Sequence, residues 1–204
     1  MALHITLGCM YASKTTSLIT KYESLKSSGV DVVVIDYDIN KENKCYKGML
    51  SNHDGIMIPC IKAVVLYDVL DIYKMRGNFQ MSHEYDHNYD FITSPELYEV
   101  KNAVTTCQVI MINEAQFYDD LFPFVKQFLK KNKEIYIYGL DGDFKQEKIG
   151  YILDLIPLCD SVQKLKAECS LCKMPAIFSH RVSGETNQYQ PYAKYISLCR
   201  KCNE

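Results

Sequence analysis

The chain has 204 residues, of which 48% are apolar and 24% charged, and its formal net charge is −2. These values are typical of a soluble globular protein with one full core and room for a small appendix. The balanced charge offers no basic surface for a nucleic-acid partner, and no apolar run is long enough for a membrane-spanning helix. The N-terminus lacks the basic start and apolar run of a signal peptide, so we expect a cytoplasmic protein.

Short β-branched runs alternate with stretches of helical periodicity along the first 140 or so residues. The expected strands are residues 3–7, 30–35, 56–61, 107–112 and 134–140. The expected helices are residues 15–27, 64–74 and 119–131. The nearly unbroken apolar runs are typical of strands buried on both faces, and strand–helix alternation implies parallel pairing with right-handed crossovers. The predicted fold class is therefore α/β.

Two segments interrupt this order. Residues 76–94 are polar and without periodicity, and they contain His83 and His87. That histidine spacing can bind a metal ion, but two histidines alone fit an exposed loop better, so we interpret the segment as an insertion. From about residue 159, short strand-like pieces at 161–166, 176–180 and 195–198 surround paired cysteines. We therefore expect a nucleotide-binding domain at 1–158 and a small second domain at 159–204.

A candidate phosphate-binding loop follows the first expected strand and opens the first expected helix. Its residues are Gly8, Cys9, Met10, Tyr11, Ala12, Ser13, Lys14 and Thr15. In this context backbone N–H groups surround a β-phosphate, the Lys14 ammonium neutralises β/γ charge, and the Thr15 hydroxyl binds Mg²⁺. Ser13 stands where the motif normally has glycine, and it would fit if its backbone torsions were helical. The alternative is a strand–helix junction that happens to contain these residue types.

A second candidate motif lies where the strand at 107–112 ends, at Asn113 and Glu114. In phosphate-loop enzymes an acid at such a strand end holds Mg²⁺; Asn113 can coordinate the ion but brings no charge. Glu114 is the candidate general base that accepts a proton from an attacking hydroxyl. The alternative is a polar strand end that leads into a helix N-terminus, where acids are favoured. The order of the two motifs along the chain favours the catalytic interpretation.

Four of the nine cysteines form two Cys-x-x-Cys pairs. The pairs are Cys169 with Cys172 and Cys199 with Cys202. Two such knuckles allow four thiolates to bind one Zn²⁺ tetrahedrally, whereas a redox motif or two disulfides are the alternatives. A closed ligand set makes the metal structural, and it would fasten the ends of the loop at 173–198. The use as a zinc ribbon that binds nucleic acid is disfavoured because the enclosed loop is nearly neutral.

Together these motifs resemble those of the cytosolic-type (type II) thymidine kinases. The Gly-Pro-Met-Phe-Ser-Gly-Lys-Ser/Thr loop of that family is matched at Gly8, Met10, Lys14 and Thr15. Its Thr-His-Asp, Asp-Glu-Gly/Ala-Gln-Phe-Phe and Leu-Asp-Gly-Thr-Phe motifs are echoed at 52–54, 113–118 and 140–144, and its cysteine motifs at 164–172 and 194–202. The similarity covers nearly the whole chain in the same order. It implies a three-layer, P-loop NTPase-like parallel sheet with a small zinc-ribbon-like domain.

The resemblance also implies an activity, namely transfer of the ATP γ-phosphoryl group to thymidine, or another deoxynucleoside, in nucleotide salvage. Glu114 would be the general base on the 5′-hydroxyl, and Mg²⁺ would be associated with Thr15, Asp54 and Asn113. Met10, Leu140 and Ser179 would line the space for the 5-methyl group. Gln116, Phe117, Phe144, Arg181 and Tyr195 would complete the nucleoside site. The loop after Gly184 would close over the base as a lasso, and the family association implies a homotetramer.

The chain departs from the family pattern at several positions. Ser13 replaces the second loop glycine, Asn113 replaces the metal-associated acid, and Gly55 stands where many members have arginine. Residues 190–193 replace the Gly-Gly pair that usually precedes the lasso tyrosine. These changes leave an alternative open, a weak or inactive kinase homologue that binds a nucleoside or a protein. The retained residues on the nucleoside side favour the kinase.

Overall fold

The structure, a computed structural model, describes residues 1–40, 45–70, 95–184, 186–188, 190 and 193–204. The expected insertion at 76–94, with its two histidines, lies outside the described residues, and so do Pro191 and Tyr192 of the expected lasso. The helix expected at 64–74 is described only up to residue 70, where it forms the 3-10 helix η1 (Leu66–Leu70).

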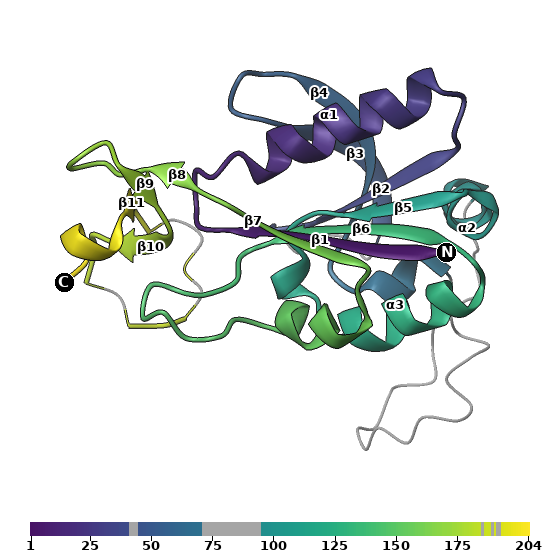
Figure 1. The fold of residues 1–204 in the computed structure, drawn as a ribbon. Coiled ribbons are helices and arrows are strands. Elements are labelled where there is room, and N and C mark those ends of the chain that lie inside the picture. The colour runs from purple at the N-terminus through teal and green to yellow at the C-terminus, as the bar shows by residue number, and fades with distance from the viewer. Residues whose placement is uncertain (41–44, 71–94, 185, 189, 191–192) are drawn as a thin grey trace, which may run out of the picture.

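A seven-stranded sheet forms the centre of the molecule, with strand order β3-β4-β2-β5-β6-β1-β7 (Figure 1). All neighbouring strands are parallel except β3 and β4, which pair antiparallel. The strands are β1 (Ala2–Gly8), β2 (Val32–Tyr37), β3 (Cys45–Ser51), β4 (Met57–Ala63), β5 (Val109–Ile112), β6 (Glu134–Gly139) and β7 (Ser161–Leu165). The predicted α/β class with a mostly parallel sheet is confirmed.

Helices cover both faces of this sheet, which produces the three predicted layers (Figure 1). On one face, α1 (Lys14–Ser27) packs Leu18 and Ile19 onto the sheet. On the other face lie α3 (Leu121–Lys130) and η5 (Ile152–Leu158). All four residues of β5 are buried because they have a covered face on either side, as the unbroken apolar run predicted.

The predicted helical stripe on α3 is present, since its buried side chains recur at helical spacing. They are Leu121, Phe124, Val125 and Phe128. Such a stripe turns one side of the helix to the core and the other to water. None of the described helices has the combination of length and apolar character that is needed to cross a bilayer.

Two elements at one edge of the sheet were not predicted. The edge strand β3 reads Cys-Tyr-Lys-Gly-Met-Leu-Ser, and its mixed polarity gives no clear strand pattern. The helix α2 (Pro95–Thr106) follows the expected insertion and lies beside η1 and β3. Its buried residues Val100 and Val104 join the core one helical turn apart.

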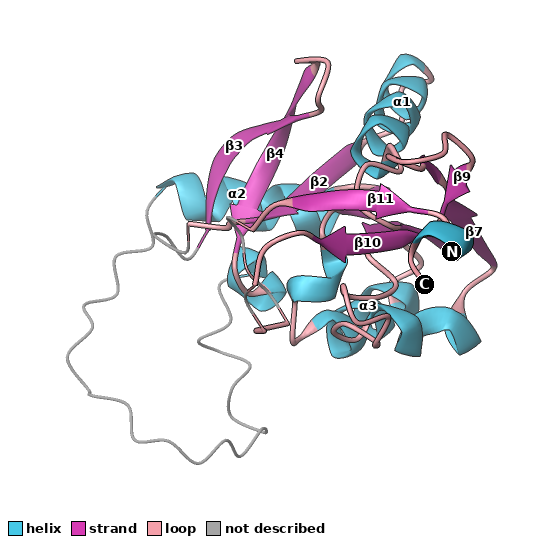
Figure 2. Ribbon diagram, turned by 90° about the vertical axis from the view of Figure 1, so that its left-hand side faces the viewer, coloured by secondary structure: helices cyan, strands magenta, loops and turns pink. Residues whose placement is uncertain are grey.

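A small unit of short strands follows the main sheet, and we call the described residues from 167 to 204 the C-terminal unit. It contains two two-stranded antiparallel sheets, which lie at one end of the molecule (Figures 1 and 2). Its elements are β8 (Ala167–Glu168), β9 (Pro175–Ala176), β10 (Phe178–Arg181), β11 (Tyr195–Leu198) and η6 (Arg200–Cys202). The piece at 161–166, which the sequence grouped with this unit, is instead mostly β7. Because β7 pairs in parallel with β1, the main sheet continues past residue 158.

Candidate functional site

The candidate phosphate loop connects β1 to α1, as the sequence predicted. Gly8 is required there by a close approach of the neighbouring backbone. A Cβ at this position would lie 2.9 Å from the carbonyl oxygen of Leu165 and 3.1 Å from the Cβ of Ala12. The loop is thus seated directly against the end of β7, and a larger residue at position 8 would push it away.

Ser13 adopts a left-handed backbone conformation, with φ 59° and ψ 29°, immediately before α1 begins. The helical torsions under which a serine would fit are therefore absent. For a residue with a Cβ this conformation costs about 1–2 kcal/mol, a cost that glycine avoids. Tyr11, two residues earlier, also has a positive φ of 64°. The backbone at position 13 thus has a conformation that favours glycine, but the residue there is serine.

Lys14 lies at the centre of the loop, and its residue is only 8% exposed. Its Nζ donates a hydrogen bond of 2.9 Å to the carbonyl oxygen of Cys9. Burial lowers the pKa of Lys14, while the negative charges of Glu114 and Asp141 act in the opposite direction. A buried ammonium beside a ring of backbone groups is the arrangement that binds a polyphosphate. Thr15 follows it in the first turn of α1.

Asn113 is held by a neighbouring acid that the sequence did not single out. Its Nδ2 donates a hydrogen bond of 2.8 Å to Oδ1 of Asp36, and both residues are buried. The other carboxylate oxygen of Asp36 forms an ion pair with Lys62 on β4. Burial lowers the pKa of Lys62, but the hydrogen bond and charge of Asp36 outweigh this and leave it raised. The side-chain amide of Asn113 thus belongs to a polar cluster at the strand ends, together with Asp36 and Lys62.

Glu114 also has a left-handed backbone, with φ 49°, which turns the chain sharply after β5. Its carboxylate accepts a hydrogen bond of 2.6 Å from Nε2 of Gln116. The Oε1 of Gln116 accepts a bond of 2.9 Å from the backbone N–H of Leu140, just after β6. Gln116 is 3% exposed, so it links the candidate base to the neighbouring strand end. The resemblance placed Gln116 at the nucleoside; here it orients Glu114.

Several expected nucleoside-binding residues gather around Arg181. Its guanidinium carbon lies 3.9 Å from the ring centroid of Phe144, and its Nε donates a bond of 3.0 Å to the hydroxyl of Tyr195. The guanidinium also donates to the carbonyl oxygens of Asn187 and Gln188 at 2.6 and 3.2 Å. Arg181 therefore connects the loop after residue 184 to the aromatic ring of Phe144.

The remaining expected nucleoside residues lie close by. Met10 and Ser179 are brought together, because the Met10 backbone N–H donates a hydrogen bond of 2.9 Å to the Ser179 hydroxyl. Phe117 packs its ring against Tyr37, with centroids 5.1 Å apart. These contacts join the phosphate loop to β10, and Phe117 to the end of β2.

The turn that carries Asp54 reaches α1 beside the phosphate loop. Asn52 donates from its Nδ2 to the Asp54 carboxylate and to the Thr16 hydroxyl, both at 3.3 Å. The ring of His53 lies 6.0 Å from that of Tyr11. The β3–β4 hairpin thus places a carboxylate near the first turn of α1, where the sequence expected a magnesium-associated acid.

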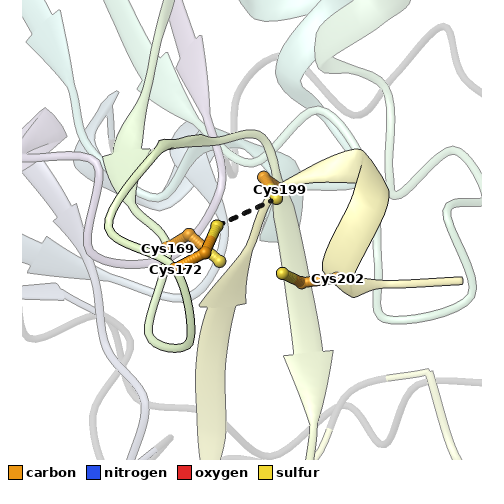
Figure 3. Close-up of side chains that lie close together, drawn as sticks. All are labelled: Cys169, Cys172, Cys199 and Cys202. Atoms are coloured by element: carbon orange, nitrogen blue, oxygen red, sulfur yellow. Dashed lines mark hydrogen bonds between the residues drawn. The ribbon is translucent and has the colours of Figure 1, made fainter.

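The four paired cysteines come together in the C-terminal unit, with Sγ atoms within 4.8 Å of one another (Figure 3). In the part of the chain that the structure describes, no other group of three or more potential metal ligands is found. Burial raises the pKa of the Cys169 thiol, but hydrogen bonds from surrounding backbone N–H groups lower it to about 6. A cluster of four cysteine sulfur atoms is a donor set that Zn²⁺ prefers.

An open groove of about 630 Å³ lies along α1, next to the phosphate loop. Its lining is rich in hydroxyls and contains two lysines. The lining residues are Ala12, Ser13, Thr16, Ser17, Thr20, Lys21, Ser24, Leu165 and Lys166.

Sequence reasoning missed Asp36, Lys62 and Asp141, which surround the strand ends. Asp141 pairs with Lys164 and lies near enough to Lys14 to act on its pKa. The sequence carried one signal for this group, an aspartate near the end of the apolar run Val-Val-Val-Ile-Asp-Tyr. An acid buried in such a run needs a charged or hydrogen-bonding partner.

Known proteins resemble this chain in sequence along most of its length. The family model described as thymidine kinase matches residues 1–81 and 67–203. A thymidine kinase of Oryza sativa subsp. japonica is 34% identical over 90% of this chain and 58% of its own length. Thymidine kinase a of Arabidopsis thaliana is 30% identical over 98% of this chain and 74% of its own length. The thymidine kinase of Variola virus is 29% identical over 98% of this chain and 95% of its own length. The chain spans less than two thirds of the rice protein. It belongs to the thymidine kinase family.

Proposed function

We propose that this chain transfers the γ-phosphoryl group of ATP to the 5′-hydroxyl of thymidine and thereby forms dTMP in the cytoplasm. One observation carries the proposal: Lys14 follows β1 and Glu114 follows β5, so both lie beyond the carboxyl ends of parallel strands that only β6 separates. A phosphate-binding cation and a candidate base at one edge of a parallel sheet are the two groups that phosphoryl transfer to an alcohol requires.

Glu114 accepts the proton of the 5′-hydroxyl as the oxygen attacks the γ-phosphorus. The hydrogen bond from Gln116 fixes the carboxylate toward the substrate. The loop N–H groups and Lys14 stabilise the charge on the transferring group. Thr15 and Asp54 would hold the Mg²⁺ that accompanies ATP, with Asn113 as a neutral neighbour, and the ion would supply further charge neutralisation.

The nucleoside binds on the side of Glu114, at residues that the family resemblance assigns to it: Phe117, Phe144, Arg181 and Tyr195, with Met10 and Leu140. The ring of Phe144, which the resemblance assigns to the pyrimidine, packs against Arg181 in this structure, and the Lys145 ammonium lies 5.6 Å from the same ring. Tyr195 is hydrogen-bonded to Arg181, which connects this part of the C-terminal unit to Phe144.

The donor nucleoside lies in the groove along α1. Because transfer is in line, acceptor and leaving group occupy opposite sides of the γ-phosphorus. Strand order supports this placement: Glu114 follows β5, whereas Leu165 and Lys166 of the groove lie at the end of β7, on the far side of β1. The groove has hydroxyls and lysines but no aromatic residue in its lining, so it favours ribose and phosphate contacts over base stacking.

The four cysteines bind a structural Zn²⁺, and the active protein is a homotetramer. The cluster of four sulfur atoms supports the zinc site, whereas the homotetramer is supported by the family resemblance alone. Elemental analysis should find about one zinc per chain. Light scattering with size-exclusion chromatography tests the assembly, and a monomer that retains full activity would contradict it.

The direct test is a phosphoryl-transfer assay with Mg·ATP and thymidine, deoxyuridine and deoxycytidine as separate acceptors. We expect dTMP formation by the wild-type chain and its near-complete loss in Lys14→Ala, which removes the phosphate-binding cation. Lys26→Ala, in the last turn of the same helix and outside both the loop and the groove, controls for loss of a positive charge. Turnover of the wild type no greater than that of Lys14→Ala would exclude a kinase.

The second candidate is a homologue that binds a nucleoside without phosphorylating it. It is favoured by the left-handed Ser13 and by the commitment of Asn113 to Asp36, which both lie on the phosphate-binding side. Calorimetric titration separates the two. Thymidine binding without Mg·ATP binding supports the non-catalytic protein, whereas binding of both supports the kinase.

A further inference from the structure

The outer side of the phosphate loop rests on the C-terminal unit. Cys9 and Ala12 are only 2% and 3% exposed, and they pack in one apolar cluster with residues of that unit. The partners are Ala167, Cys169, Ala176 and Leu198, with Cys199 and Cys202 at the periphery. The cluster thus contains both loop residues and cysteines of the metal-binding tetrad.

Two hydrogen bonds cross the same boundary. The backbone N–H of Met10 donates to the Ser179 hydroxyl at 2.9 Å, and the Cys9 thiol donates to the Ala176 carbonyl oxygen at 3.6 Å. Burial raises the pKa of the Cys9 thiol, which keeps it a donor. The first bond is the stronger of the two because a sulfur donor is weak.

The position of Ser179 in its strand explains how it reaches the loop. Along β10 the residues alternate between half-buried and buried, and Ser179 and Arg181 share the buried side. Arg181 contacts Phe144 on the main domain, while Ser179 contacts the loop. Directly opposite Ser179 on β11 lies Ser197, whose hydroxyl donates to the Glu168 carbonyl within the C-terminal unit.

We propose that Ser179 is a positioning residue that holds the phosphate loop in its anion-binding shape. The loop binds phosphate through backbone N–H groups, so its affinity depends on how those groups are oriented before the ligand arrives. Two loop residues have positive φ, and a loop in such a conformation persists only when its surroundings restrain it. The hydroxyl of Ser179 supplies that restraint from a second structural unit.

This role differs from the lining of a methyl pocket that the family resemblance gave to Ser179. A hydroxyl that accepts a loop N–H affects the phosphate donor, whereas a side chain that touches the base affects the nucleoside. The inference rests on the proposed function in one respect only, namely that ATP is the phosphate donor.

The first experiment measures hydrogen–deuterium exchange of the peptide that covers the loop, in the protein without nucleotide. We expect faster exchange across residues 8–13 in Ser179→Ala, and wild-type exchange in Ser179→Thr, which keeps the hydroxyl. Ser197→Ala is the matched control, because it removes a buried serine hydroxyl in the same hairpin but not the bond to the loop. Unchanged exchange in Ser179→Ala, or equal acceleration in Ser197→Ala, overturns the proposal.

The second experiment titrates Mg·ATP and thymidine separately into the same variants by calorimetry. Ser179→Ala should weaken Mg·ATP binding by about three- to tenfold, the size expected from one lost hydrogen bond, and leave thymidine binding within about twofold. Weakened thymidine binding with unchanged Mg·ATP binding overturns the proposal and returns Ser179 to the nucleoside pocket. If the wild type binds no Mg·ATP, the proposed function fails, and the exchange experiment still decides the role of Ser179.

Discussion

The two sides of the candidate site differ in how their polar groups are satisfied. The phosphate side, meaning the loop at 8–15 with Asn113 and Asp36, contains a left-handed serine and an amide already paired with a buried acid. The nucleoside side, meaning Glu114, Gln116, Phe144, Arg181 and Tyr195, contains two sets of contacts, one between Glu114 and Gln116 and one among the other three residues. Both sides contain a left-handed residue, Ser13 on one and Glu114 on the other, so backbone strain alone does not distinguish them. The difference is that Ser13 and Asn113, which depart from the family pattern, both lie on the phosphate side.

Replacing the base on the nucleoside side should have the largest effect on the reaction. We expect Glu114→Gln to lower kcat by about 10²- to 10⁴-fold, because the amide cannot accept the hydroxyl proton. Thymidine and Mg·ATP affinities should change little, since the side chain keeps its size. Steady-state kinetics and calorimetry measure the two effects, with Glu147→Gln, an exposed glutamate, as the control. A kcat close to that of the wild type would remove Glu114 from the base role.

Replacing one of the four clustered cysteines tests whether the proposed zinc site stabilises the fold. Cys202→Ser should lower stability by about 3 kcal/mol or more, because a structural zinc contributes its binding free energy to folding. For a chain of this size, this corresponds to a fall in Tm of roughly 6–12 °C. Cys159→Ser, outside the tetrad, serves as the control, and zinc content and thermal unfolding are the measurements. Full stability in the metal-free variant would refute the structural role.

The sequence predicted the parts of the site that are encoded locally. The phosphate loop needs only a strand, a short motif and a helix in succession, and the cysteines need two adjacent pairs. The alternation of helical and β-branched segments was likewise enough to predict the three-layer arrangement. These features depend on neighbours a few residues apart, which a sequence displays directly.

The contacts that distinguish this chain join residues far apart in the sequence. Asn113 meets Asp36 across 77 positions, and Met10 meets Ser179 across 169. The periodicity of the sequence does not predict such pairs, because they depend on which strands become neighbours in the sheet. The strand β7 was misgrouped for the same reason: its place beside β1 is a property of the sheet and not of its own five residues.

Asn113→Asp tests why the phosphate side lacks the family's acid. The change would place a second carboxylate within hydrogen-bonding distance of Asp36, so we expect it to lower stability by about 1–3 kcal/mol. It should therefore fail to raise activity, although it restores the family residue. Chemical unfolding and kcat measure these effects, and Asn102→Asp on the exposed side of α2 controls for added charge.

The compensated variant Asp36→Asn/Asn113→Asp restores one amide and one carboxylate with their positions exchanged. It should recover most of the lost stability, because the hydrogen bond can form again and Lys62 remains beside the pair. If Asn113→Asp alone is as stable as the wild type, the two side chains do not constrain each other as the structure indicates.

Ser13→Gly should produce the smallest effect, and it acts on the strain of the phosphate side alone. Glycine adopts the left-handed conformation without a Cβ clash, so stability should rise by up to about 1 kcal/mol. A relaxed turn into α1 should also improve Mg·ATP affinity by a few-fold, while thymidine affinity stays unchanged. Gln146→Gly is the matched control, because Gln146 also has a positive φ, of 67°, but lies outside the loop. It should gain similar stability without any gain in Mg·ATP binding, and equal gains in both variants would show that strain at Ser13 does not limit the donor site.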